Sequence, residues 1–124
     1  MRYLLIELMG IFLNIRTESV LSSRCKMLRR LVLDVLKPHS PSVITLCEAL
    51  SKLEGVEGVN VIIYEIDQQV ENAKVIVGGN GIDFESVKKT LEDMGAAIHS
   101  VDEVAAGKRI IEEVRTPQDR SARI

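Results

Sequence analysis

The chain has 124 residues, which is enough for one ordinary domain and too few for two. Hydrophobic residues make up 46% and charged residues 27% of the sequence, a balance typical of a globular protein rather than a disordered one. A formal net charge of −2 and only two Tyr and two Phe argue against a nucleic-acid or membrane-surface partner, and we expect neither. The two cysteines, Cys25 and Cys47, lack metal-ligand or redox spacing and indicate a reducing, cytoplasmic compartment.

The first 26 residues differ in character from the rest of the chain. They hold four basic and two acidic residues, and their apolar stretch 3–15 is interrupted by Glu7 and Asn14 and is too short to span a bilayer. We expect one of two origins for this N-terminal extension. Either the start is misassigned and Met27 is the true first residue, or the segment is an amphipathic helix that docks on the domain.

Residues 29–37 (RRLVLDVLK) are rich in branched residues, with Leu31, Leu33 and Val35 at alternate positions, which predicts a strand. Ser40 is a good helix N-cap and Pro41 suits the first helical position, so we expect a helix to begin there. Gly55 fits the end of this helix. Its apolar residues recur at helical spacing and form one stripe: Val43, Leu46, Cys47, Leu50 and Leu53.

Residues 59–67 and 73–78 are two further apolar runs separated by a polar turn, and they predict a β-hairpin. The glycine-rich stretch 78–81 is expected to be a loop, with Asp83 as the N-cap of the helix behind it. That helix is expected to end at Gly95. Its apolar face consists of Phe84, Val87, Leu91 and Met94.

The C-terminal part of the chain predicts two more strands. We expect a fourth strand over residues 96–104, which Gly107 ends, and a short fifth strand over residues 109–114. Residues 116–124 have the composition of a loose tail. The folded domain is therefore expected to cover residues 27–115.

The order of elements, β-α-β-β-α-β, predicts an α+β fold of the ferredoxin-like type. Right-handed crossovers place both helices on one face of an antiparallel sheet with strand order 4-1-3-2. In the first strand, the apolar set Leu31, Leu33 and Val35 is expected to face the helices. Val32 and Leu36 then lie on the opposite, open face.

The open face of this predicted sheet is unusually apolar. In the second strand two apolar sets compete for it, either Val59, Val61 and Ile63 or Ile62, Tyr64 and Ile66, and Ile76 of the third strand joins whichever set faces outward. An uncovered antiparallel face is normally polar, and covering apolar surface is worth about 25 cal/mol per Å². We therefore expect a second copy of the chain to cover this face as a homo-oligomer. The alternative covers lie within one chain: the N-terminal extension or the fifth strand.

Six residues are candidates for a divalent metal site. Asp34 lies in the middle of the first strand and His99 in its predicted neighbour, so the two side chains can pair or share a cation. The ordinary alternative is a salt bridge or hydrogen bond at an interface. Acidic side chains also gather at predicted strand ends, where their oxygens suit a hard cation such as Ca²⁺ or form a solvated rim: Glu65, Asp67, Asp102 and Glu103.

Enzymatic activity is less expected than a binding or assembly role. The glycine-rich stretch 78–81 lacks the lysine of a phosphate-binding loop, and Asp83 places a negative charge where an anion would bind. No spacing of Ser, His and Asp marks a nucleophile–base pair, so we assign no catalytic residue.

Several stretches of the sequence resemble an archaeal family known as domain of unknown function 211. They are LRRLVLDVLKPH at 28–39, LEGVEGVN at 53–60, YEID at 64–67, IHSVDEVAAG at 98–107 and EEVRTPQD at 112–119. The resemblance implies a ferredoxin-like fold and ring-like homo-oligomers, and it implies no known activity. The N-terminal extension departs from the family pattern. An amino-acid-sensing regulatory domain of the ACT type shares the topology and is the alternative.

Overall fold

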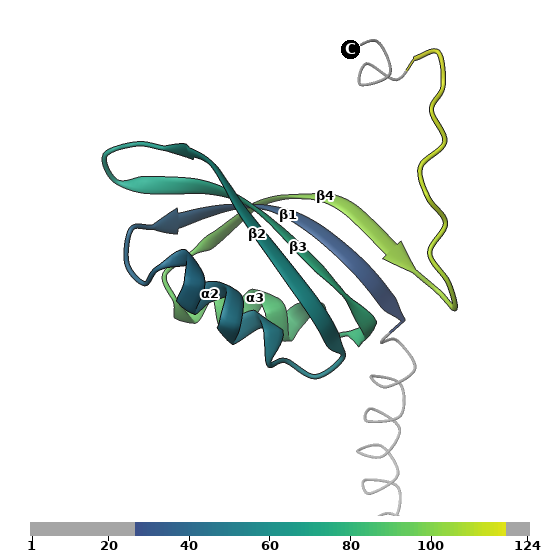
Figure 1. Cartoon of the computed structure of the whole chain (residues 1–124), viewed down its shortest axis with the longest axis horizontal. Coiled ribbons are helices and arrows are strands. Elements are labelled where there is room, and N and C mark those ends of the chain that lie inside the picture. The colour runs from purple at the N-terminus through teal and green to yellow at the C-terminus, as the bar shows by residue number, and fades with distance from the viewer. Residues whose placement is uncertain (1–26, 119–124) are drawn as a thin grey trace, which may run out of the picture.

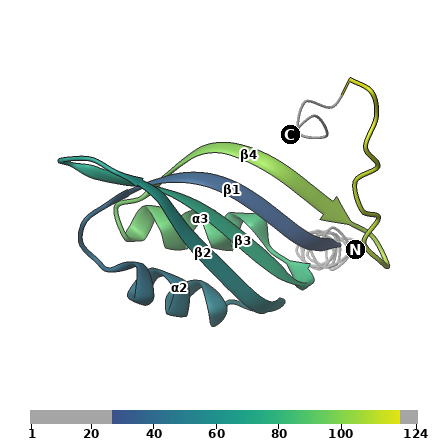
Figure 2. The ribbon, with the colours of Figure 1, turned by 45° about the horizontal axis from the view of Figure 1, so that its top comes forward.

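The computed structural model describes residues 27–118, so the predictions for residues 1–26 and 119–124 lie outside the described part. The elements follow in the order β1 (Leu28–Pro38), α2 (Val43–Ser51), β2 (Val56–Ile66), β3 (Val70–Ile82), α3 (Phe84–Asp93) and β4 (Ala97–Ala106). The strands form one antiparallel sheet in the order β2-β3-β1-β4, and both helices cover the same face of it (Figures 1 and 2). The ferredoxin-like fold and its predicted strand order are confirmed. No helix within residues 27–118 has the length and apolar composition that crossing a membrane requires.

The core lies between the sheet and the two helices. Leu31, Leu33 and Val35 of β1 are buried against the helices, as their alternation predicts. Helix α2 contributes Leu46 and Leu50 to the same core. The remaining buried apolar residues of this cluster are Ala73, Val75, Val77, Ile82, Val87, Leu91 and Ala96.

The register of β2 settles which of its two apolar sets faces the core. Val61 pairs with Val75, which in turn pairs with Leu33, so this row lies on the helix side of the sheet. Val59, Val61 and Ile63 pack against the core, while Ile62 and Tyr64 are exposed on the open face. The register shifts after Ile63, so that Ile66 pairs with Glu71 and lies on the same side of the sheet as Lys37, the helix side.

Helix α2 begins two residues later than expected, because its N-cap is Ser42 and not Ser40. Ser42 has the extended backbone of a cap residue, and its hydroxyl accepts a hydrogen bond of 3.2 Å from the backbone N–H of Thr45. The hydroxyl of an N-cap residue accepts from the N–H three residues later, so a helix that starts at Val43 is capped by Ser42 through Thr45.

The glycine-rich stretch 78–81 is part of β3 and not a loop, so this prediction is wrong. Gly78 pairs with Gly58 and Gly79 with Val56, and the N–H of Asn80 donates to the carbonyl of Gly55 at 2.8 Å. The two backbones approach so closely that a side chain on Gly79 would not fit. Glycine therefore extends the strand here instead of ending it.

The fifth strand predicted over residues 109–114 does not form. The chain turns at Gly107 (φ +113°) after β4 and runs on without a strand partner among residues 27–118. The turn is tied to the start of β1, because Arg29 Nε donates to the Gly107 carbonyl at 2.8 Å and the Gly107 N–H donates to Met27. Figure 1 shows the segment that follows, residues 109–116, leaving the sheet on the side opposite the helices. We call this segment the C-terminal arm.

Candidate functional site: the open face of the sheet

The open face is the side of the sheet that the helices leave uncovered, and its residues lie in rows across the strands. From β2 to β4, the first row is Gly58, Gly78, Arg30 and Ala105, the second is Asn60, Ile76, Val32 and Glu103, and the third is Ile62, Lys74, Asp34 and Ser100. Apolar and charged side chains therefore alternate along this face. It combines the apolar surface expected from the sequence with a set of charges at its centre.

The third row opens a small hollow of about 320 Å³, here called the central hollow, lined by Asp34, Ile62, Tyr64, Lys74 and Asp102. The Tyr64 hydroxyl donates a short hydrogen bond to the Asp34 carboxylate. This bond raises the pKa of Tyr64 to about 12, because ionisation of the phenol would place two anions side by side. One ammonium, two carboxylates and a phenol thus meet in one hollow.

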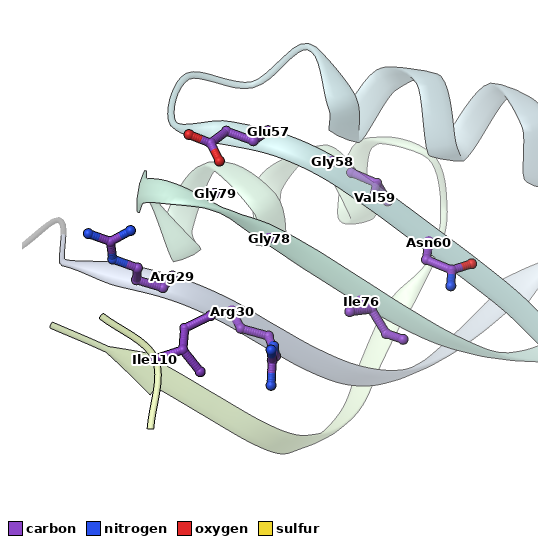
Figure 3. Close-up of a pocket in the computed structure, with 10 residues that line it drawn as sticks. All are labelled: Arg29, Arg30, Glu57, Gly58, Val59, Asn60, Ile76, Gly78, Gly79 and Ile110. Carbon is purple, nitrogen blue, oxygen red and sulfur yellow. The ribbon is translucent and has the colours of Figure 1, made fainter. Parts of the chain in front are cut away.

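A larger hollow of about 520 Å³, here called the glycine hollow, lies at the other end of the open face (Figure 3). Its floor is bare backbone, since Gly58 and Gly78 stand opposite each other in β2 and β3. A Cβ atom on Gly58 would meet nothing within 4 Å. Ten residues line this hollow: Arg29, Arg30, Glu57, Gly58, Val59, Asn60, Ile76, Gly78, Gly79 and Ile110.

The root of the C-terminal arm is fixed beside the glycine hollow by an ion pair. Arg30 donates two parallel hydrogen bonds of 3.1 Å each to the carboxylate of Glu112 and a third of 3.2 Å to Glu103. The pairing lowers the pKa of Glu112 and raises that of Arg30. A forked arginine–carboxylate pair fixes orientation as well as distance, so it sets the direction in which the arm leaves the sheet.

Three of the six metal-site candidates lie at the centre of this face, although they are not all free to bind. Asp34 and Asp102 line the central hollow together, but Lys74 lies in the same hollow. Asp34 accepts from Tyr64, and Asp102 accepts from the Ser100 hydroxyl at 2.7 Å. The third candidate, Glu103, makes the ion pair with Arg30.

The other three candidates lie apart from the central hollow. Asp67 caps the turn between β2 and β3, where its carboxylate accepts from the N–H groups of Gln69 and Val70 at 2.9 Å, and these bonds lower its pKa. Glu65 accepts from the side-chain amide of Asn72. His99 is exposed on β4, and Asp34 faces Ser100 there because the register shifts beside it. Within residues 27–118 no three His, Cys, Asp or Glu side chains gather as ligands of one ion, so the metal site stays a prediction.

Sequence reasoning missed a buried ion pair at the opposite end of β1. The Lys37 ammonium is 1% exposed and donates to Glu71 at 2.9 Å and to the Pro38 carbonyl at 2.7 Å. His39 contacts Glu71 and the Gln68 carbonyl, each at 3.1 Å. Both contacts favour the doubly protonated ring, and Glu71 raises the pKa of His39 while His39 and Lys37 lower that of Glu71. The cluster ties the end of β1 to the hairpin turn.

Comparison with known proteins places the chain in a family. The family model described as uncharacterized ArCR, domain of unknown function 211, matches residues 29–120. An uncharacterized protein of Methanocaldococcus jannaschii, MJ0319, is 53% identical over 93 residues, which are 75% of this chain and 96% of the relative's length. The family match covers nearly all of the described residues, and both findings confirm the resemblance seen in the sequence. The chain therefore belongs to the archaeal family of domain of unknown function 211.

Proposed function

We propose that the protein is a non-catalytic cytoplasmic module that works as a homo-oligomer, in which a second copy covers the open face of the sheet. The observation that carries this proposal is the exposure of large apolar side chains on that face. Ile62 and Tyr64 of β2 are 43% and 55% exposed on this face. Ile76 and Val32 lie in the neighbouring row, so these side chains form one apolar surface rather than scattered single residues.

The charges of the open face suit burial between two copies. Lys74, Asp34 and Asp102 bring both signs into one hollow, so a facing copy can pair with them while it covers Ile62 and Ile76. Apolar contact then supplies the driving force, and the charges fix the relative position of the copies. A closed ring or a dimer satisfies these requirements equally, and the family resemblance favours a ring.

Light scattering on the wild-type protein at micromolar concentration tests the proposal, with an oligomer as the expected result. Ile62→Asp is expected to shift the mass toward the monomer, because it places an unpaired charge in the interface. Ile44→Asp is the matched control, since Ile44 is 67% exposed on α2 on the far side of the molecule. A monomeric wild type overturns the proposal, and equal masses for the two variants show that the open face is not the interface.

A second candidate function is binding of a divalent cation such as Ca²⁺ between copies. The observation that favours it is the presence of the Asp34 and Asp102 carboxylates in one hollow, to which a facing copy would add two more. Lys74 in the same hollow competes with a cation for these carboxylates. We therefore rank this candidate below simple assembly.

Thermal unfolding with added CaCl₂ tests the second candidate, since binding to the native state raises Tm. The wild type is expected to gain stability, and the variant Asp34→Asn with Asp102→Asn is expected to gain none. Asp93→Asn is the control, because Asp93 is an exposed carboxylate on α3. If CaCl₂ does not raise the Tm of the wild type, the hypothesis of cation binding is rejected. Stabilisation by a free amino acid alone would favour the ACT-like regulatory alternative instead.

A further inference from the structure

The side chain of His39 lies between two groups that can only accept hydrogen bonds. Its Nδ1 is 3.1 Å from a carboxylate oxygen of Glu71, and its Nε2 is 3.1 Å from the backbone carbonyl oxygen of Gln68. A neutral imidazole has one N–H and one bare nitrogen, so it can donate to one of these acceptors and must turn a lone pair toward the other. Only the doubly protonated ring donates to both, and the contacts of His39 therefore require a charged ring.

The carboxylate of Glu71 is held in place by a second cation. One of its oxygens accepts from the Lys37 ammonium at 2.9 Å, and the other contacts His39. The side chains of Lys37 and Glu71 are 1% and 17% exposed, so a carboxylate that turned away to solvent would leave a buried ammonium without its counter-charge. Asp67 of the turn is the other charged group that acts on His39 among residues 27–118. The acceptor on β3 thus stays in position whether or not His39 is protonated.

His39 bonds to the tip of the hairpin turn, beyond the last strand pair. Strand β2 ends at Ile66 and β3 begins at Val70, and the ladder between β1 and β3 ends where Pro38 pairs with Val70. Gln68 lies outside this ladder, and its carbonyl accepts from His39. Protonation of the ring therefore decides how the turn is attached to the end of β1.

We propose that His39 is a proton-controlled clamp on the hairpin turn, which holds the turn against the end of β1 while the ring carries two protons and loosens it when one is lost. Loss of one proton leaves either the Gln68 carbonyl or the Glu71 carboxylate without its donor from the ring. The clamp is a conformational device of the single domain, so it goes beyond the proposed homo-oligomer and does not depend on it.

The charges around the clamp set the direction of its pH dependence. Glu71 and the Gln68 carbonyl raise the pKa of His39 above its ordinary value of 6.5. The stability that the ring contributes is therefore complete below about pH 6.5 and is lost as the pH rises through the raised pKa. His39 and Lys37 lower the pKa of Glu71, so the contribution of this carboxylate is lost only as the pH falls through that lowered value. The clamp is closed in mildly acidic solution and opens as the solution becomes alkaline.

NMR of the ¹⁵N-labelled full chain tests the clamp at the ring and at the turn. Both ring nitrogens of His39 are expected to carry a proton at pH 6, which long-range ¹⁵N–¹H correlation detects. Hydrogen exchange of the Asp67 amide reports on the turn, because this N–H donates to the Val70 carbonyl at 3.0 Å. Its protection, relative to an unstructured peptide at the same pH, is expected to fall about threefold or more between pH 6 and pH 8, within the limit of about tenfold per pH unit that one proton sets.

Two histidine variants separate the clamp from other effects of pH. His39→Gln keeps a hydrogen-bond donor but cannot gain the second proton, so the protection of Asp67 is expected to change less than about twofold over the same range. His99→Gln is the matched control, since His99 is exposed on β4, which pairs with β1 alone, and it is expected to lose protection as the wild type does. A ring with a single N–H at pH 6, a wild type whose protection does not depend on pH, or the same pH dependence in His39→Gln as in the wild type overturns the inference.

Discussion

Replacing Gly79 with alanine is expected to lower the free energy of unfolding by about 3 kcal/mol or more. A Cβ atom on Gly79 would lie 1.9 Å from the carbonyl oxygen of Gly55 and 2.9 Å from the N–H nitrogen of Glu57. Both neighbours are backbone atoms, so no side chain can rotate away to make room. The methyl group must separate β3 from the turn that precedes β2, and it must break the bond from Asn80 to Gly55.

Urea unfolding of Gly79→Ala beside Gly58→Ala measures this effect with an internal control. Both substitutions exchange the same atoms in neighbouring strands, but a Cβ atom on Gly58 meets nothing within 4 Å. Gly58→Ala is therefore expected to change the free energy of unfolding by less than about 1 kcal/mol. Equal losses in the two variants would show that the close approach at Gly79 does not constrain the fold.

The same glycines show where sequence reasoning reaches its limit for this fold. Alternation predicted β1 and its buried face, because Leu31, Leu33 and Val35 are separated by one residue each and nothing competes with that assignment. Gly78 and Gly79 suggest a loop when the chain is taken alone. Their role depends on Gly58 and Val56, which lie opposite them only after β2 and β3 have paired.

The candidate site was predictable to a smaller extent. Asp34 was identified from its place in a central strand, but its partner Tyr64 was not, since either apolar set of β2 fitted the open face. Lys74 carried no signal either, because an exposed lysine in a strand is ordinary. The direction of the C-terminal arm depends on the pairing of Arg30 with Glu112, residues 82 positions apart in the chain.

Lys37 carried a signal that alternation alone could have revealed. It continues the buried series of β1, two residues after Val35, so its side chain enters the helix side of the sheet. Its ammonium donates there to Glu71 and to the Pro38 carbonyl. A lysine at the end of a buried set is therefore expected to have an acidic partner on the neighbouring strand, and Glu71 of β3 pairs directly with it.

Lys37→Met is accordingly expected to lower the free energy of unfolding by about 2 kcal/mol, measured by urea unfolding at neutral pH. Methionine keeps most of the aliphatic stem, so the loss reports the ammonium and not a cavity. The Pro38 carbonyl loses the donor that stands at 2.7 Å, and an acceptor left without a partner costs about 1–3 kcal/mol. Lys89→Met is the control, because Lys89 is exposed on α3 and its ammonium is 3.6 Å from Asp93. The free energy of unfolding of this variant is expected to change by no more than about 0.5 kcal/mol. If Lys37→Met and Lys89→Met unfold with the same free energy, the buried ion pair contributes no net stability. The cost of removing the two charges from water would then equal the attraction between them.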